Sequence, residues 1–215
     1  MHGMDIFEAI QANDSAAFAQ LLDSDASQSN ARHDGGATPI LWAIYHGRPE
    51  LAHELVRRGA SVSFAEACAL GDEAKALAML NESSIDQRSE DGFPPVSLAI
   101  FFGHGALARQ LIERGANVNA AAENAQRVAP VHAAAAVCDR ETMRMLLERG
   151  ADPNAKQQGD FTPLHGAASR GDREMAELLL AHGADRQAKS ADGKTPADVA
   201  RERGYPSIGD FLASE

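Results

Sequence analysis

The sequence contains little cysteine and few aromatic residues. Of its 215 residues, only Cys68 and Cys138 are cysteines, and the aromatic residues are eight Phe, two Tyr and one Trp. Two isolated thiols cannot supply the paired cysteines of a structural zinc site. We expect both cysteines to fill space in the structure, and the alternative for Cys138 is a partly exposed reactive thiol.

Long apolar runs are absent as well. No stretch approaches the 18 apolar residues that mark a membrane-spanning helix. Residues 1–5 show no basic region followed by an apolar core, so no secretory signal is visible. A cytoplasmic location is therefore expected, and secretion without a recognisable signal stays open as the alternative.

Positive charge is scarce, because the net charge is −11 and the isoelectric point is about 5.1. Phosphate groups are bound by clustered Lys and Arg, which argues against nucleic acid and anionic membranes as partners. The same charge permits a basic protein partner.

Catalytic and metal-binding patterns are also missing. The sequence has no G-x-S-x-G, no G-x-x-x-x-G-K and no dinucleotide glycine pattern. Its scattered histidines lack the spacing, with a neighbouring Glu, that zinc hydrolases use. We expect no enzyme, no cofactor and no metal. Catalysis by paired carboxylates such as Glu90 and Asp91 is the remote alternative.

What the sequence does contain is a pattern that recurs seven times, mostly at about 33 residues. Its clearest copy begins at Thr162-Pro163-Leu164-His165. An apolar anchor follows the Thr-Pro step, at Ile6, Ile40, Phe64, Val96, Val131, Leu164 and Ala197. Alanine follows three residues later, at Ala9, Ala43, Ala67, Ala99, Ala134, Ala167 and Ala200. A fixed period of this length is the signature of a repeat solenoid.

Each copy predicts a helix, a turn, a second helix and a long loop. The turn position, seven residues after the anchor, holds Asn13, Gly47, Gly71, Gly103, Cys138, Gly171 and Gly204. A residue that ends a helix often needs a positive φ, which glycine and asparagine tolerate. The next residue is often an Asp suited to an N-cap, as in Asp72 and Asp172. A leucine-rich position 15 residues after the anchor then marks the buried stripe of the second helix.

These residues resemble the ankyrin repeat, whose hallmark is Thr-Pro-Leu-His-x-Ala in a unit of about 33 residues. Residues 115–119 and 150–154 match the way that family ends its unit. The resemblance implies an all-α ankyrin-type solenoid. It also implies that His132 and His165 hydrogen-bond within and between loops. We expect one domain over 1–215, with cap repeats at 4–29 and 190–215 and inner repeats at 33–62, 64–85, 89–119, 124–154 and 157–186.

Two places depart from the regular pattern. The anchors Ile40 and Phe64 are only 24 residues apart, and no Thr-Pro step or turn-rich loop precedes Phe64. We therefore expect the third repeat to be a helix pair without its protruding loop, which would leave a notch in the row of loops. The loop over 120–129 contains no glycine, and the sequence does not settle its conformation. Because Cys68 and Cys138 fall two repeats apart, we expect about 20 Å between them and no disulfide.

The resemblance places ligand contacts on the loops and on the two residues before each turn, which face the concave side. On this basis the expected partner-binding residues are Tyr45, His46, Leu70, Phe93, Phe101, Phe102, Val137, Phe161 and Arg170. Five of them are aromatic in a chain with few aromatics, and exposed aromatics anchor protein interfaces. The alternative is that Phe93, Phe101 and Phe102 pack on one another. Trp42 is expected in the core.

The expected function is a non-catalytic module that binds a protein or peptide through its concave face, as an adaptor, inhibitor or scaffold. Acidic loop tips would favour a basic partner; they are Asp34, Glu90, Asp91, Asp160 and Asp192. We expect a monomer. The alternative from another class is a structural module that uses the same apolar groove to form a homodimer.

Overall fold

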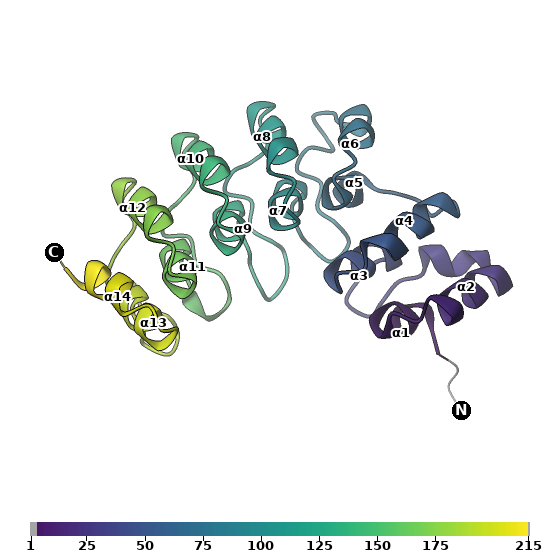
Figure 1. Cartoon of the computed structure of the whole chain (residues 1–215). Coiled ribbons are helices and arrows are strands. Elements are labelled where there is room, and N and C mark those ends of the chain that lie inside the picture. The colour runs from purple at the N-terminus through teal and green to yellow at the C-terminus, as the bar shows by residue number, and fades with distance from the viewer. Residues whose placement is uncertain (1–3, 215) are drawn as a thin grey trace. The chain divides into compact units, whose positions relative to one another are not determined.

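The computed structural model describes residues 4–214, and it contains fourteen α-helices and no strand within them (Figure 1). The chain divides into two compact units, residues 1–95 and 96–215, which we call unit 1 and unit 2. The all-α solenoid class expected from the sequence is confirmed. That the whole chain forms one domain stays a prediction.

Unit 1 is built of helix pairs that follow one another along the chain. Helix α1 packs on α2 and α3, and α3 packs on α4 and α5. The elements are α1 (Ile6–Ala12), α2 (Ser15–Ser24), the 3₁₀ helix η1 (Ala26–Asn30), α3 (Pro39–Tyr45), α4 (Pro49–Arg57), α5 (Phe64–Leu70) and α6 (Glu73–Met79).

Unit 2 continues the same alternation. Helix α11 packs on α9, α12 and α13, while α10 packs on α8, α9 and α12 (Figure 1). The elements are α7 (Pro95–Phe101), α8 (Gly105–Glu113), α9 (Pro130–Val137), α10 (Arg140–Glu148), the 3₁₀ helix η2 (Gln158–Asp160), α11 (Pro163–Arg170), α12 (Arg173–Ala181), α13 (Pro196–Glu202) and α14 (Pro206–Ala213). Only Pro95, the first residue of α7, belongs to unit 1.

The helix boundaries follow from the capping residues of the sequence. Asp72 and Asp172 cap α6 and α12, because each carboxylate accepts a hydrogen bond from a backbone N–H of the first turn. All seven predicted turn residues have a positive φ. Cys138 is the unusual one, because it adopts φ 58° without being a glycine or asparagine.

The repeating alanine lets paired helices approach closely. All seven repeat alanines have no exposed surface, and all seven apolar anchors are buried. The leucine position is less uniform, because Leu21 and Met79 are only half-buried. In α2 the neighbouring Leu22 is the buried residue, and in α6 the Met79 side chain faces a cavity described below.

The long loops form protruding fingers. In each finger, the first residue donates a backbone hydrogen bond to the last, for example Ser89 to Phe93 (2.9 Å) and Gln157 to Phe161 (3.0 Å). The fingers span 33–37, 89–93, 122–128, 157–161 and 190–194. The glycine-free finger 122–128 turns at Arg127, which takes φ 50°. Backbone bonds tie neighbouring fingers in unit 2, from Gln158 to Gln126 (2.8 Å) and from Ala191 to Gly159 (2.8 Å).

No finger stands between α4 and α5. The chain runs directly from the end of α4 at Arg57 through 58–62 to Ser63, which caps α5. The base of the usual loop is retained, because Asn30 Oδ1 accepts from the Ser61 backbone (2.8 Å), as Asn119 does from Asp152 (2.9 Å). The shortened spacing therefore removes the protruding part of the loop and keeps its base.

Arg201, Glu202 and Arg203 are exposed at the end of α13, as a solvent-facing cap requires. None of the helices in residues 4–214 is long and apolar enough to cross a bilayer.

Candidate partner-binding groove

The structure brings three of the predicted partner-binding residues together in unit 2. Phe101, Phe161 and Arg170 line one cavity of about 250 Å³. Val128, Ala136 and Ser169, which occupy the same face positions in the sequence pattern, line it as well. We call this cavity and its rim the unit 2 groove.

Three helices, α7, α9 and α11, and the fingers 122–128 and 157–161 contribute to the groove. Helices α9 and α11 pack side by side, and the finger 157–161 delivers Phe161 and Gln157 to one wall. Small residues form much of the helical wall, where a methyl group on Gly166 would lie 3.2 Å from the Ala135 side chain. Residues this small leave room for a side chain from outside.

Several residues of this wall lie outside the predicted face positions. Ala133 and Gly166 lie three residues before Ala136 and Ser169 and also line the groove. On a helix, residues three apart share a face, so helical periodicity would have added them. Val137 was predicted and is 37% exposed, but it does not line the cavity.

Phe101 is the most exposed large apolar side chain of the described residues, at 51%. Its ring meets that of Phe102 edge to face, with centroids 5.3 Å apart and planes at 87°. The packing alternative is therefore partly correct, because these two rings do contact each other. That contact still leaves half of Phe101 open to solvent at the groove.

The histidines beneath the groove play the structural role expected of them. His132 Nδ1 accepts a hydrogen bond from the Ala129 backbone (3.1 Å), so Nε2 carries the proton. Nε2 donates to the carbonyl of Ala155 (2.9 Å), which lies just before the finger 157–161. His165 likewise accepts from Thr162 and donates to the Lys194 carbonyl (3.0 Å). Burial lowers the pKa of both rings, which favours the neutral form that this bonding requires.

The predicted residues of unit 1 are more engaged in the fold. The Tyr45 hydroxyl donates to Asp91 Oδ2 (2.5 Å), and its ring lies 6.3 Å from that of Phe93. Burial, with the Asp91 charge second, raises the pKa of Tyr45. Tyr45 and Phe93 are both half-buried, so they join the finger 89–93 to α3.

His46 and Leu70 pack inward. The His46 ring lies 4.5 Å from that of Trp42, and its Nδ1 bonds to the Trp42 carbonyl (2.9 Å). Leu70 packs against the apolar core of unit 1. Trp42, expected in the core, is half-buried; it contacts Phe7 and His33 and donates to the Phe7 carbonyl (3.1 Å).

Both cysteines are free thiols. Cys68 is buried, and burial raises its pKa to about 12. Burial and then the neighbouring Asp172 charge raise the pKa of Cys138. Since the thiolate is the reactive form, both shifts favour the space-filling interpretation over the reactive one.

Comparison with protein families matches three ankyrin descriptions to successive parts of the chain. A single ankyrin repeat matches residues 35–66, ankyrin repeats in three copies match 64–157, and ankyrin repeats in many copies match 146–200. The chain belongs to the ankyrin repeat family. Ankyrin repeats are generally protein–protein interaction modules and are typically non-catalytic. Among residues 4–214 of this ankyrin protein, no three His, Cys, Asp or Glu side chains gather as metal ligands.

Proposed function

We propose that this ankyrin protein is a non-catalytic adaptor, inhibitor or scaffold that binds a protein or peptide through the unit 2 groove. The observation that carries the proposal is the half-exposed Phe101 ring beside a cavity walled by small residues. Aromatic side chains anchor interfaces when they sit at the centre of a pocket, and an open apolar surface usually marks a binding site.

Charge supplies the second part of the proposal. Arg170 lines the groove, whereas the chain as a whole carries a net charge of −11. We propose an apolar residue of the partner against Phe101 and Phe161, an acceptor group against Arg170, and a basic surface on the remainder of the partner. Nucleic acid is not part of this proposal, because its phosphates require clustered Lys and Arg.

The proposal places the protein in the cytoplasm as a monomer. Self-association through the same groove is the competing idea, since exposed Phe101 would also be covered by a second copy. The two differ in the molecular mass measured by sedimentation at micromolar concentration. A mass of 22.8 kDa fits the proposal, and twice that mass favours self-association.

The experiment compares protein capture from native lysate by the wild type and by Phe101→Ser. We expect the captured partner to be lost with Phe101→Ser, because truncating an interface anchor costs about 2 kcal/mol or more, which is roughly thirtyfold in affinity. The matched control is Met4→Ser, which changes another exposed apolar residue (44% exposed) far along the chain.

Both variants should melt like the wild type, because neither side chain is buried. Capture that survives Phe101→Ser, or that is lost equally with Met4→Ser, would overturn the assignment of the groove.

A further inference from the structure

One cavity of unit 1 lies where the finger is missing. It measures about 480 Å³, within the size range of ligand pockets. Its walls come from the segments before α3, before α5 and after α6. We call it the finger gap.

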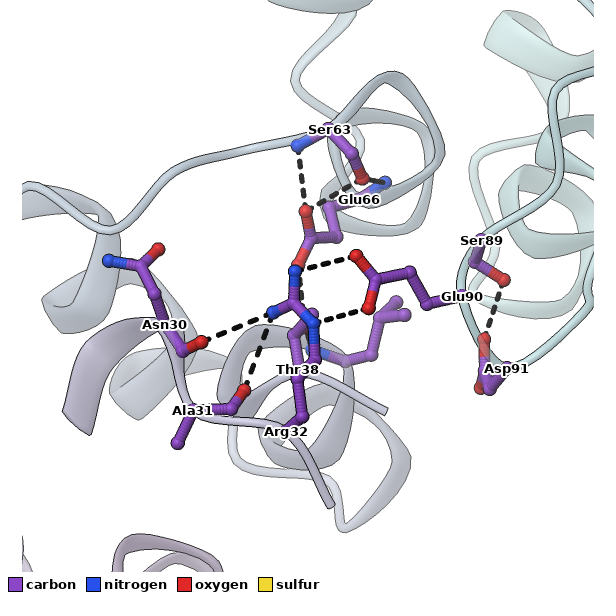
Figure 2. Close-up of polar contacts among 10 residues, drawn as sticks. Asn30, Ala31, Arg32, Thr38, Ser63, Glu66, Ser89, Glu90 and Asp91 are labelled. Carbon is purple, nitrogen blue, oxygen red and sulfur yellow. Dashed lines mark hydrogen bonds and ion pairs between the residues drawn. The ribbon is translucent and has the colours of Figure 1, made fainter. Parts of the chain in front are cut away.

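The fingers on the two sides of the gap approach each other at their tips. A methyl group on Gly36 would lie only 2.7 Å from the Glu90 carbonyl oxygen. Arg32 forms an ion pair with Glu90, and Figure 2 shows its guanidinium facing that carboxylate. Both side chains are about half exposed, and exposed ion pairs of this kind add little stability. This exposed ion pair beside the tips therefore contributes little to joining them.

A buried carboxylate forms part of the wall of the gap. Glu66 is only 3% exposed, and it is the third residue of α5, as His132 and His165 are the third residues of α9 and α11. Its Oε2 accepts from the Ser63 backbone and hydroxyl (both 2.7 Å), and its Oε1 accepts from the Thr38 hydroxyl (Figure 2). Burying a carboxylate is costly unless its charge is compensated.

Glu66 forms no ion pair with a basic side chain within residues 4–214. Four charged residues line the gap, namely Arg32, Glu66, Arg88 and Glu90. Arg32 is already held by Glu90 and by the Asn30 and Ala31 carbonyls. Glu66 has hydroxyl and backbone partners only, and Oε1 has accepted a single bond. The chemistry that would complete this site is a cation.

The rest of the wall suits a peptide. It is rich in hydroxyl and amide groups, and the backbone N–H of Val62 and the side-chain amide of Gln87 make no hydrogen bond within the described part of the chain. Apolar surface from Leu41, Phe64 and Met79 is also present. A regular repeat places a finger of its own chain at this position.

The charge of unit 1 is unusually one-sided. Residues 1–95 contain 15 Asp and Glu against 6 Lys and Arg, whereas residues 96–215 contain 16 against 14. A net negative field attracts positively charged segments and speeds their association. This asymmetry acts over the same unit that contains the finger gap.

We propose that the finger gap is a second partner-binding site, which receives an extended basic segment of a protein partner in the place of the missing finger. A Lys or Arg side chain of that segment enters the gap and pairs with Glu66. This inference rests on the proposed function, since it assumes a protein partner, but it uses a site separate from the unit 2 groove.

The test uses a fluorescein-labelled nonapeptide of three Gly-Ser-Arg repeats as the probe, with fluorescence anisotropy as the readout. The Glu66→Gln variant should bind it about tenfold more weakly, because a charge-assisted hydrogen bond is lost. Glu50→Gln is the matched control, since it removes one negative charge from an exposed carboxylate of the same unit. We expect it to change the affinity less than about twofold.

A second variant tests the site independently, in case Glu66→Gln does not fold. Ser61→Phe adds bulk at an exposed residue that lines the gap, and it should weaken the probe without lowering the melting temperature. Equal losses with Glu66→Gln and Glu50→Gln would show general charge attraction and overturn the site. If N-acetyl-arginine amide binds as tightly as the nonapeptide, the claim that the gap receives an extended segment would be wrong.

The probe also separates this inference from the groove. Phe101→Ser should leave nonapeptide binding unchanged, and Glu66→Gln should retain whatever lysate partner contacts the groove alone. If the wild type does not bind the nonapeptide while Phe101-dependent capture from lysate is intact, the finger gap alone is rejected. The reverse result would reject the groove only.

Discussion

At the scale of single residues, one position of the repeat shows how the sequence adapts to its surroundings. In two repeats the third residue of the first helix is a histidine, His132 or His165. In each case the loop that follows offers a backbone carbonyl that accepts a hydrogen bond from the ring. The corresponding residue is Leu41 in the repeat that precedes the missing finger, where no such carbonyl exists. In the next repeat it is Glu66, which bonds back to Thr38. The replacement of histidine by Leu41 and Glu66 is therefore a second sequence signal for the finger gap, in addition to the short spacing between the anchors.

The two buried histidines predict a pH dependence of stability. Burial lowers their pKa in the folded protein below the ordinary value of 6.5, so the unfolded chain binds more protons just below that pH. The free energy of unfolding should fall as the pH is lowered from 7.5 to 5.5, because this contribution is complete above 6.5 and is lost on acidification. Urea denaturation at the two pH values measures it.

The control for this prediction is the double variant His132→Gln, His165→Gln. It should be less stable at pH 7.5, since two bonds to finger carbonyls are weakened, and its stability should change less between the two pH values. An unchanged pH dependence in the double variant would show that other groups cause the effect.

At the scale of elements, the periodicity of the sequence predicted most of the helices. Anchor, alanine and turn positions all lie where a helix pair requires them, because close helix packing and positive φ each admit few residue types. The leucine position failed at Leu21 and Met79, where neighbouring contacts differ from those of the inner repeats. The conformation of the finger 122–128 could not be predicted, because Arg127 adopts a positive φ, which arginine rarely does.

Overpacking the repeat alanine tests the close helix packing. Ala167 has no exposed surface in α11, which lies between α9 and α13. Ala167→Leu should lower the free energy of unfolding by about 1–3 kcal/mol, because a well-packed interior cannot accept three more carbon atoms without strain. Ala181→Leu adds the same volume at the exposed end of α12 and should change it by less than about 0.5 kcal/mol. Similar denaturation midpoints for the two variants would contradict the packing.

At the scale of the whole molecule, the family determines the architecture and the surface residues determine the partner. The candidate site was predicted in part: Phe101, Phe161 and Arg170 share a cavity, whereas His46 and Leu70 support the fold instead. Face position alone cannot separate these cases, because exposure depends on which neighbours cover each side chain. The sequence predicted the finger gap only as a notch in the row of loops. The role of Glu66 could not be predicted, because it depends on the hydrogen bond to Thr38 and on the cavity around it.

The central claim is that the unit 2 groove contacts a protein partner, and photocrosslinking in native lysate tests it most directly. Benzoylphenylalanine at position 101 should give an adduct heavier than the 22.8 kDa chain, and Phe161→Ser should diminish it. The same group at position 4 serves as the control and should give no such adduct. An adduct of twice the chain mass, or equal adducts from positions 101 and 4, would contradict the account.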